Sequence, residues 1–140
     1  MSKHTPLDKN VKREASSFGY QLLRADVLAN LLGKEQEQIL YWAGKSLARK
    51  YKLSSIDEVI VFFNQADWGT LAVIKEKKTE MMFQLTDHLY DESHPYSVQL
   101  EAGFLAEQIQ QIKSRIAETT VKQKKATFVF TVQWDHKDEV

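Results

Sequence analysis

Apolar residues in the first half of the chain recur every three or four positions, which is the spacing of a helix with one buried face. This pattern covers residues 18–33, where Gly33 offers a C-terminal stop, and residues 35–51. A third segment begins at Ser55, and Glu58 three residues later completes the signature of a capping box. The sequence therefore predicts three helices before residue 68.

Beyond residue 69 the apolar positions alternate with polar ones, as in strands that bury one face. Residues 70–76 and 80–85 flank a short polar segment and predict a hairpin. A second hairpin is predicted from a weak strand at 116–122 and a strong one at 126–134. One face of that last strand carries four large apolar side chains, namely Phe128, Phe130, Val132 and Trp134. The sheet is thus expected to have one apolar side.

A long helix over residues 98–116 is predicted between the hairpins, because its apolar residues stay on one side of a helix. They are Val98, Ala102, Leu105, Ile109, Ile112 and Ile116. The element order is then ααα-ββ-α-ββ, an α+β domain in which a layer of about four helices covers a four-stranded antiparallel sheet. We expect one domain at 18–134, between a flexible polar leader at 1–17 and a polar tail at 135–140.

Two glycines interrupt these helical patterns, Gly44 in the second helix and Gly103 in the last. A glycine inside a helix costs roughly 1 kcal/mol against alanine, so its presence favours a close approach of another backbone. Each follows an alanine, and we expect each Ala-Gly pair to bring its helix close to a neighbouring helix or to the sheet. The alternative is that an isolated helical glycine such as Gly103 is merely tolerated.

Composition removes several classes of function. The chain has 140 residues with 19 basic and 19 acidic side chains, so it lacks the basic field that draws proteins to nucleic acid. The absence of cysteine excludes disulfides and thiolate metal sites. No apolar segment has the length of a signal-peptide core or a transmembrane helix. We therefore expect a cytoplasmic protein that binds no nucleic acid and has no transmembrane segment.

Four segments carry a resemblance to a known family. They are YQLLRADVLANLLGKEQEQILYWAGKSLARKY, WGTLAVIKEKKTEMMFQL, QLEAGFLAEQI and FVFTVQW, which together run from about Phe18 to Trp134. They resemble the YslB-like family of small bacterial proteins, whose function is uncharacterised.

A wider resemblance rests on ILYWAGKSLA, WGTL and LEAGFLA followed by a terminal strand. This layout is similar to the 4-vinyl reductase domain superfamily, which includes the Bet-type subunits of the TRAPP tethering complex. The resemblance implies a four-stranded antiparallel sheet against helices, frequent dimers and, in some members, an apolar cavity. Members with metal or lipid attachment use cysteines, and this chain has none. A reductase activity is therefore not carried over.

Signals for catalysis and metal binding are weak. His88 and His94 share a loop with Asp87, Asp91 and Glu92, yet their spacing matches no defined metal motif, and such loops are common on surfaces. A tail cluster of Asp135, His136 and Asp138 is weaker still. The serines lie in no nucleophile elbow, and the scattered glycines form no phosphate loop. We predict no catalytic residue, no metal and no cofactor, and an enzyme is the less favoured class.

Aromatic residues make the better case for a binding site. If rings and glycines converge where helices meet the sheet, a gap between them would hold an apolar or planar ligand. The predicted ligand-binding residues are Tyr41, Trp42, Gly44, Trp68, Gly103, Phe104, Phe128 and Phe130. The competing interpretation is that these side chains simply fill the core.

Charged positions give two smaller predictions. Glu101 stands between Leu100 and Ala102, and it is expected to be a solvated surface acid, or otherwise a carboxylate aimed at a partner. The basic segments 75–78 and 122–125 form the two hairpin tips. If the last strand pairs with the first, both tips emerge at the same edge, although lysines at such tips most often serve solubility.

Two hypotheses for function remain. The first is a non-catalytic module that binds a small apolar or planar molecule between helices and sheet. The second is a protein-interaction or scaffold subunit, acting as a homodimer through the wide apolar faces of the first and last helices and binding no ligand.

Overall fold

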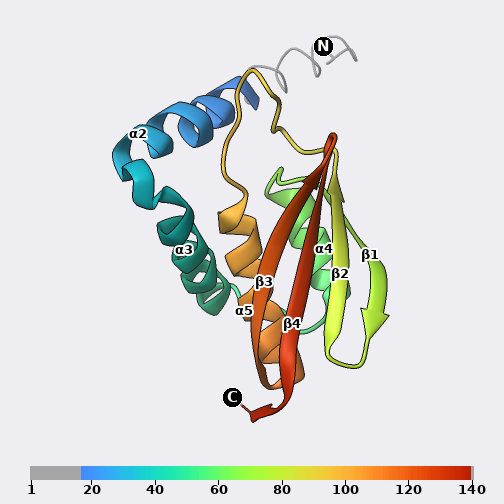
Figure 1. The fold of residues 1–140 in the computed structure, drawn as a ribbon. Coiled ribbons are helices and arrows are strands. Elements are labelled where there is room, and N and C mark those ends of the chain that lie inside the picture. Colours follow the sequence, from blue (N-terminus) through green and yellow to red (C-terminus); the bar gives the residue numbers. More distant parts are fainter. Residues whose placement is uncertain (1–16, 140) are drawn as a thin grey trace, which may run out of the picture.

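The computed structural model describes residues 17–139, with side chains described as far as Asp135. Three helical segments precede a hairpin, a long helix follows, and a second hairpin ends the domain (Figure 1). The elements are η1 (Leu22–Val27), α2 (Leu28–Leu32), η2 (Gly33–Glu35), α3 (Gln36–Lys50), α4 (Ile56–Gln65), β1 (Thr70–Lys77), β2 (Glu80–Thr86), α5 (Gln99–Lys113), β3 (Arg115–Lys124) and β4 (Thr127–Glu139). The predicted α+β class and element order are confirmed.

The first helical segment, residues 17–32, is not a uniform α-helix. Residues 17–21 are α-helical, the middle part, η1, is a π-helix, and the segment is α-helical again at α2. Gly33 stops it with a φ of 61°, a value that glycine adopts readily and that most residues avoid. A single turn of 3-10 helix, η2, then redirects the chain into α3.

The predicted cap of the next helix is confirmed. The Ser55 hydroxyl accepts a hydrogen bond from the Glu58 amide at 3.2 Å, so α4 begins at Ile56. The Glu58 carboxylate reaches back to the Ser54 amide at 2.8 Å, one residue before the cap. These two bonds satisfy donors that a helix N-terminus would otherwise leave unpaired.

The four strands lie in the order β1-β2-β4-β3, with every neighbouring pair antiparallel. The predicted apolar face of β4 is confirmed, since Phe128, Phe130, Val132 and Trp134 are all buried. β1 and β3 are the two edges of the sheet.

The prediction that both basic hairpin tips share one edge is wrong. β4 pairs with β2 and not with β1, and Glu80 lies opposite Gln133 while Leu85 lies opposite Phe128. The start of β2 therefore adjoins the C-terminal part of β4, and the two tips emerge at opposite ends of the sheet, as Figure 1 shows. Because the lysine groups are apart, they do not build a common positive rim.

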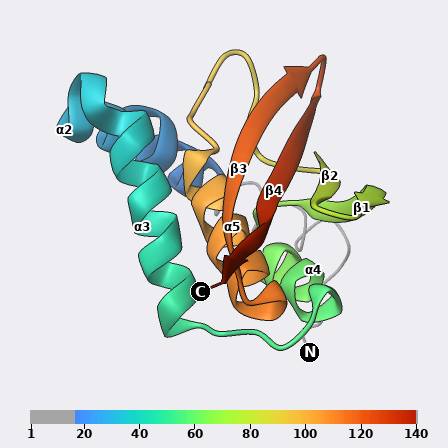
Figure 2. The ribbon, with the colours of Figure 1, turned by 60° about the horizontal axis from the view of Figure 1, so that its bottom comes forward.

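Helix α5 is the centre of the domain. Every residue from Glu101 to Ile109 is buried, because α3 covers one side of this helix and the sheet another, with α4 beside it (Figure 2). The helix ends at Ser114, whose φ of 56° turns the chain into β3. The wide apolar face predicted for the last helix is thus already covered within the same chain.

Both glycines lie where α3 crosses α5, as expected. A Cβ on Gly103 would overlap the carbonyl oxygen of Tyr41 and lie 2.8 Å from its carbon. A Cβ on Gly44 would overlap the carbonyl oxygen of Leu100 and lie 2.7 Å from the Phe104 nitrogen. Real Cβ atoms do not approach backbone so closely, hence only glycine permits this crossing at either position.

Candidate functional site

The glycine crossing closes the space in which the sequence placed part of a ligand site. Gly44 and Gly103 contact backbone directly and leave no gap between α3 and α5. Tyr41 is half-buried there, and its hydroxyl accepts a hydrogen bond from the Thr119 amide at 3.0 Å. Trp42 lies on the outer side of α3 and is 60% exposed.

The remaining predicted aromatic residues separate into two groups. Trp68 and Phe104 pack edge to face with their ring centres 5.2 Å apart, and Phe62 stacks on Phe104 at 4.6 Å. Phe130 is fully buried beneath the sheet. This first cluster is dense core packing, which aromatic pairs stabilise beyond the area that they bury.

The second cluster lies beside the loop that connects β2 to α5. The Tyr90 ring packs against Phe128 at 5.1 Å and against Tyr96 at 5.7 Å, in both cases edge to face. His88 also packs against Phe128 at 5.1 Å and against Tyr90 at 6.0 Å, and its Nε2 lies 2.7 Å from the Ala126 carbonyl oxygen. Phe128 is the one predicted ligand-binding residue in this cluster.

An open cleft of about 400 Å³ adjoins this second cluster. One wall comes from the start of α3 and from α2, the second from β3 and β4, and the floor from the loop before α5. The lining residues are Ala29, Gln36, Glu37, Tyr90, Pro95, Tyr96, Ser97, Val98, Gln99, Val121, Gln123 and Phe128. A neighbouring groove, lined in part by Tyr41 and Thr119, continues along β3.

Two residues that line the cleft each have a buried side-chain polar atom without a hydrogen-bond partner among the described residues. These atoms are the Tyr96 hydroxyl and the Gln36 side-chain oxygen. Burial raises the pKa of Tyr96, and the Leu89 backbone counteracts this slightly without reaching hydrogen-bond geometry. Since an unpaired buried polar group costs free energy, such atoms beside a cleft indicate a place for a polar ligand atom.

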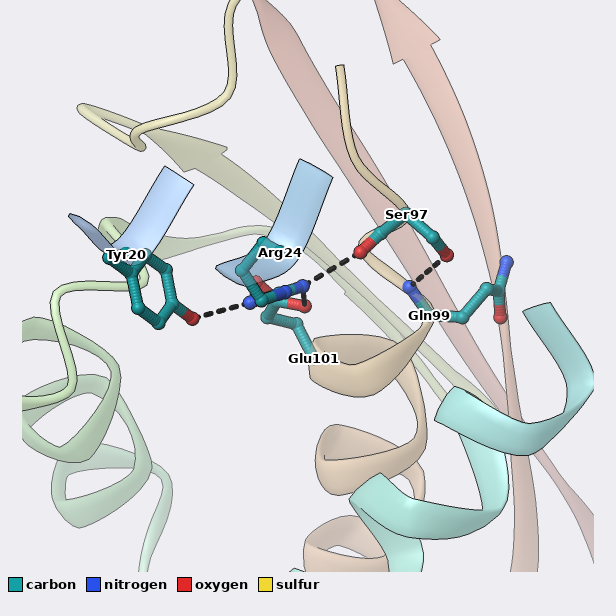
Figure 3. Close-up of polar contacts among 5 residues, drawn as sticks. All are labelled: Tyr20, Arg24, Ser97, Gln99 and Glu101. Atoms are coloured by element: carbon teal, nitrogen blue, oxygen red, sulfur yellow. Dashed lines mark hydrogen bonds and ion pairs between the residues drawn. The ribbon is translucent and has the colours of Figure 1, made fainter. Parts of the chain in front are cut away.

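Beneath the cleft lies a buried ion pair, drawn in Figure 3. The Arg24 guanidinium meets the Glu101 carboxylate with two hydrogen bonds, of 2.8 and 3.2 Å, and both residues are buried, at 2% and 0% exposure. Arg24 also donates to the Ser97 carbonyl at 2.7 Å and to the Tyr20 hydroxyl. The pair joins the first helical segment to the first turn of α5.

The interpretation of Glu101 as a solvated surface acid is wrong. Its position on α5 is covered on every side, and its partner lies 77 residues earlier in the chain. Burial disfavours the charge of Arg24, but the carboxylate of Glu101 outweighs it and raises the pKa of Arg24. Two hydrogen bonds between a guanidinium and a carboxylate offset much of the desolvation cost of burying both charges.

The ion pair also supports the cleft. The Arg24 guanidinium carbon lies 4.5 Å from the centre of the Tyr96 ring, and Ser97, whose carbonyl it binds, lines the same cleft. Burial raises the pKa of Tyr20, whose hydroxyl accepts a hydrogen bond from Arg24, against the effect of the guanidinium. Arg24 thus positions the loop that forms the floor of the cleft.

The acidic loop does not form a metal centre in the part of the chain that is described. No group of three histidine, cysteine, aspartate or glutamate side chains comes together there to hold a metal ion. Asp91 accepts hydrogen bonds from the Ser93 side chain and amide, and these bonds lower the pKa of Asp91. The loop residues therefore stabilise their own turn.

Sequence reasoning missed Arg24, Glu101, Tyr96 and Gln36. One signal was present: Arg24 follows Tyr20 by four residues and precedes Leu28 by four, so it lies on an otherwise apolar face of the helix. A charge on such a face requires a partner of opposite charge. Glu101 is likewise a charged residue among apolar ones in α5, which makes it the candidate partner. Gln36 and Tyr96 carry no comparable signal.

Comparison with known proteins agrees with this structure. The chain is 42% identical over 141 residues to the Bacillus subtilis protein named "Uncharacterized protein YslB", with 96% of this chain and 95% of that protein covered. Its fold is similar to the crystal structure of a vinyl-4-reductase family protein from Methanocaldococcus jannaschii, with a TM-score of 0.61 and 21% identity over 96% of this chain and 84% of that one.

The described part of the chain contains no helix with the length and apolar character needed to cross a membrane.

Residues 17–133 match the model of a family described as "Protein of unknown function (DUF2507)". That match spans the first helical segment, the glycine crossing and nearly the whole sheet. The chain therefore belongs to the DUF2507 family and has the 4-vinyl reductase-like α+β fold.

Proposed function

We propose that the protein is a non-catalytic module that binds a small, largely apolar or planar molecule in the cleft between α3, β3 and the loop before α5. The observation that carries the proposal is the pair of unpartnered polar atoms, on Tyr96 and Gln36, in a cleft lined by aromatic rings. Ligand sites combine apolar surface with a few placed polar groups. The rings of Tyr90, Tyr96 and Phe128 supply the apolar part of this cleft, while polar groups make up the larger part of its exposed lining.

The cleft retains part of the site predicted from sequence. Phe128 lies in its wall, and Tyr41 lies in the groove that continues from it. Contact of a ligand with Trp42, Trp68, Phe104, Phe130 or the two glycines stays a prediction. The cleft itself is surrounded by residues from four separate parts of the chain, which fixes its shape through the fold.

The test is mass spectrometry of the protein purified from its own kind of cell, once under native conditions and once after denaturing extraction. A stoichiometric small molecule released by denaturation is expected. Phe128→Ala and Tyr96→Phe should reduce its retention, whereas Val61→Ala, at an exposed position of α4 outside the cleft lining, serves as the control. A protein that is empty in repeated preparations would contradict the proposal.

A second candidate function is self-association through the first helical segment. Five large apolar side chains of this segment are exposed, namely Phe18, Leu22, Leu23, Val27 and Leu31, the last at 72%. Leu23, Val27 and Leu31 are four residues apart and so lie on one helix face. Apolar faces of this kind mark contacts with other chains more often than they stay in water.

Sedimentation velocity at micromolar concentration tests this candidate. We expect a dimer for the unaltered chain and a monomer for Val27→Lys combined with Leu31→Lys. Val61→Lys is the control, because Val61 is 53% exposed on α4, away from this segment. A monomer before any substitution would exclude the homodimer.

A further inference from the structure

The outer edge of β3 changes character along its length. The Ala117 amide donates to the Gln110 side-chain oxygen at 3.2 Å, and the Thr119 amide donates to the Tyr41 hydroxyl at 3.0 Å. Both amides therefore point away from β4. Side chains from α5 and α3 occupy this part of the edge, which is a common way to protect an edge strand from unwanted pairing.

Two residues further along, the same edge has no such protection. β3 and β4 pair without interruption from Ala117 opposite Trp134 to Lys124 opposite Thr127. Because main-chain groups alternate in direction along an antiparallel strand, Val121 and Gln123 also point their N–H and C=O groups away from β4. Within the described residues, neither main-chain N–H has a side chain placed to accept from it, in contrast to Ala117 and Thr119.

This open part of the edge faces the cleft. Val121 and Gln123 line it, and Gln36 and Glu37 line it from the opposite side. α3 and β3 lie closest at the lower end of the sheet in Figure 1 and diverge toward the β3–β4 tip, and Figure 2 shows the same divergence. The side chain of Tyr41 bridges the narrow part, and no hydrogen bond between described residues bridges α3 and β3 in the wide part.

The lining of the cleft is nearly free of charge. Glu37 is the one charged residue among the described lining residues, and it is exposed. Gln36, Gln99 and Gln123 instead surround the opening with amide groups. An anionic ligand would find no cation in this lining, whereas a neutral group with both a donor and an acceptor would find complementary partners.

From these observations we infer that the cleft recognises a neutral amide-type group, in which an N–H donor and a C=O acceptor lie side by side, through main-chain pairing with β3 at Val121. This inference rests on the proposed function and specifies its ligand class. A planar lactam and an extended peptide segment both present this chemistry.

The experiment compares two matched pairs of probes. Isoquinolin-1(2H)-one is a planar lactam, and its N-methyl derivative keeps the rings and the carbonyl but lacks the donor. The tripeptide acetyl-Ala-Val-Ala-amide and its analogue with an N-methylated valine form the second pair. Binding is followed through the backbone amide signals of Val121 and Gln123 in ¹⁵N-correlated NMR spectra of the full chain.

We expect one unmethylated probe to shift both amide signals and its methylated partner to bind about tenfold more weakly, since a lost hydrogen bond leaves a buried group unpaired. The pair that shows this difference identifies the source as lactam or peptide. Equal binding of both members at the cleft would overturn the main-chain inference and leave the proposed function standing. Absence of any shift at Val121 with all four probes would overturn it too.

Two variants give an independent measurement. Val121→Pro removes the outward N–H, replaces the side chain and fixes the backbone φ, and proline is tolerated on an edge strand where the N–H faces away from the sheet. Val121→Ala keeps the N–H and changes the side chain. Loss of probe binding in the proline variant with retention in the alanine variant is expected. If the proline variant does not fold, the probe pairs alone decide, and equal loss in both folded variants would contradict the inference.

Discussion

Two elements pack against the same central helix by opposite physical means. α3 meets α5 through glycine, with backbone against backbone and no charge involved at the point of contact. The first helical segment, residues 17–32, meets α5 through a buried ion pair, while most of its large apolar side chains stay exposed. The first contact depends on the absence of atoms, and the second on two charges that must both be present.

The difference determines how each contact fails. A steric contact is lost when any side chain is added, whatever its polarity, because the helices must separate. An ion pair tolerates changes of shape but not the loss of one partner, which leaves a charge buried without compensation. The following predictions use this distinction, from the largest expected effect to the smallest.

The largest effect is expected at the glycine crossing. Gly103→Val places a branched side chain against the backbone of Tyr41, where even one Cβ has no room. We expect a loss of about 4 kcal/mol or more in the free energy of unfolding, measured by urea denaturation, which is close to the total stability of many small domains. Gly44→Val should behave alike, and a loss below about 1 kcal/mol at either position would contradict the close crossing.

The ion pair should give the next largest effect. Glu101→Gln keeps the shape of the side chain but leaves the Arg24 charge buried without a counter-ion, so we expect a loss of about 3 kcal/mol in the free energy of unfolding. Glu107→Gln is the control on the same helix, because Glu107 pairs at 3.5 Å with Arg49, whose side chain is 57% exposed. The Glu107 side chain is itself only 8% exposed, but its partner stays in solvent, so we expect a loss of about 1 kcal/mol, smaller than that for Glu101→Gln.

A double change sharpens this result. Replacing Arg24 and Glu101 together by methionine removes both charges and should recover at least half of the stability lost in Glu101→Gln, since apolar pairs of similar volume often substitute for buried ion pairs. A double variant as unstable as the single one would show that the Ser97 and Tyr20 contacts of Arg24, and not its charge, hold the segment.

Alkaline pH provides a smaller, graded test of the same region. Burial raises the pKa of Tyr20 and of Tyr96, whose rings both lie near the Arg24 guanidinium. A raised pKa in the folded state means that stability is complete below the unfolded value of 10.0 and falls as the pH rises above it. Each such tyrosine adds a slope of about 1.4 kcal/mol per pH unit in that range.

The measurement is the free energy of unfolding in urea between pH 9 and pH 11.5. Tyr96→Phe should reduce the fall of the unfolding free energy with pH by about 1.4 kcal/mol per pH unit, the contribution of one tyrosine. Tyr41, whose pKa burial raises at the glycine crossing, supplies the comparison through Tyr41→Phe. Parallel pH profiles for Tyr96→Phe and the unaltered chain would show that this hydroxyl ionises as freely in the folded state as in the unfolded one.

The glycine crossing and the ion pair also differ in how far the sequence could predict them. A glycine inside a helix has a local cost that requires an explanation, and Gly44 and Gly103 pointed correctly to a close approach. Capping at Ser55 and the apolar face of β4 were equally local and equally predictable. Glu101 was misjudged because its partner comes from a segment 77 residues away.

The order of the strands escaped prediction for a related reason. Alternation along β4 indicates which side chains are buried, but it does not say whether β1 or β2 lies beside that strand. The cleft was missed because Gln36 and Tyr96 reach it from separate segments and are ordinary residues in each. Local chemistry therefore predicts elements and faces, while sites assembled from several segments require the structure.

The smallest effect is expected at Gly19, where the first helical segment begins its course toward η1. A Cβ there would have nothing within 4 Å, in contrast to the two glycines of the crossing. Gly19→Ala should raise the free energy of unfolding by about 0.5 to 1 kcal/mol, because alanine favours the helical state and restricts the unfolded chain. Chemical denaturation measures this gain. A loss of stability would mean that this segment packs against another surface at Gly19, and an ion pair alone would then not explain its attachment.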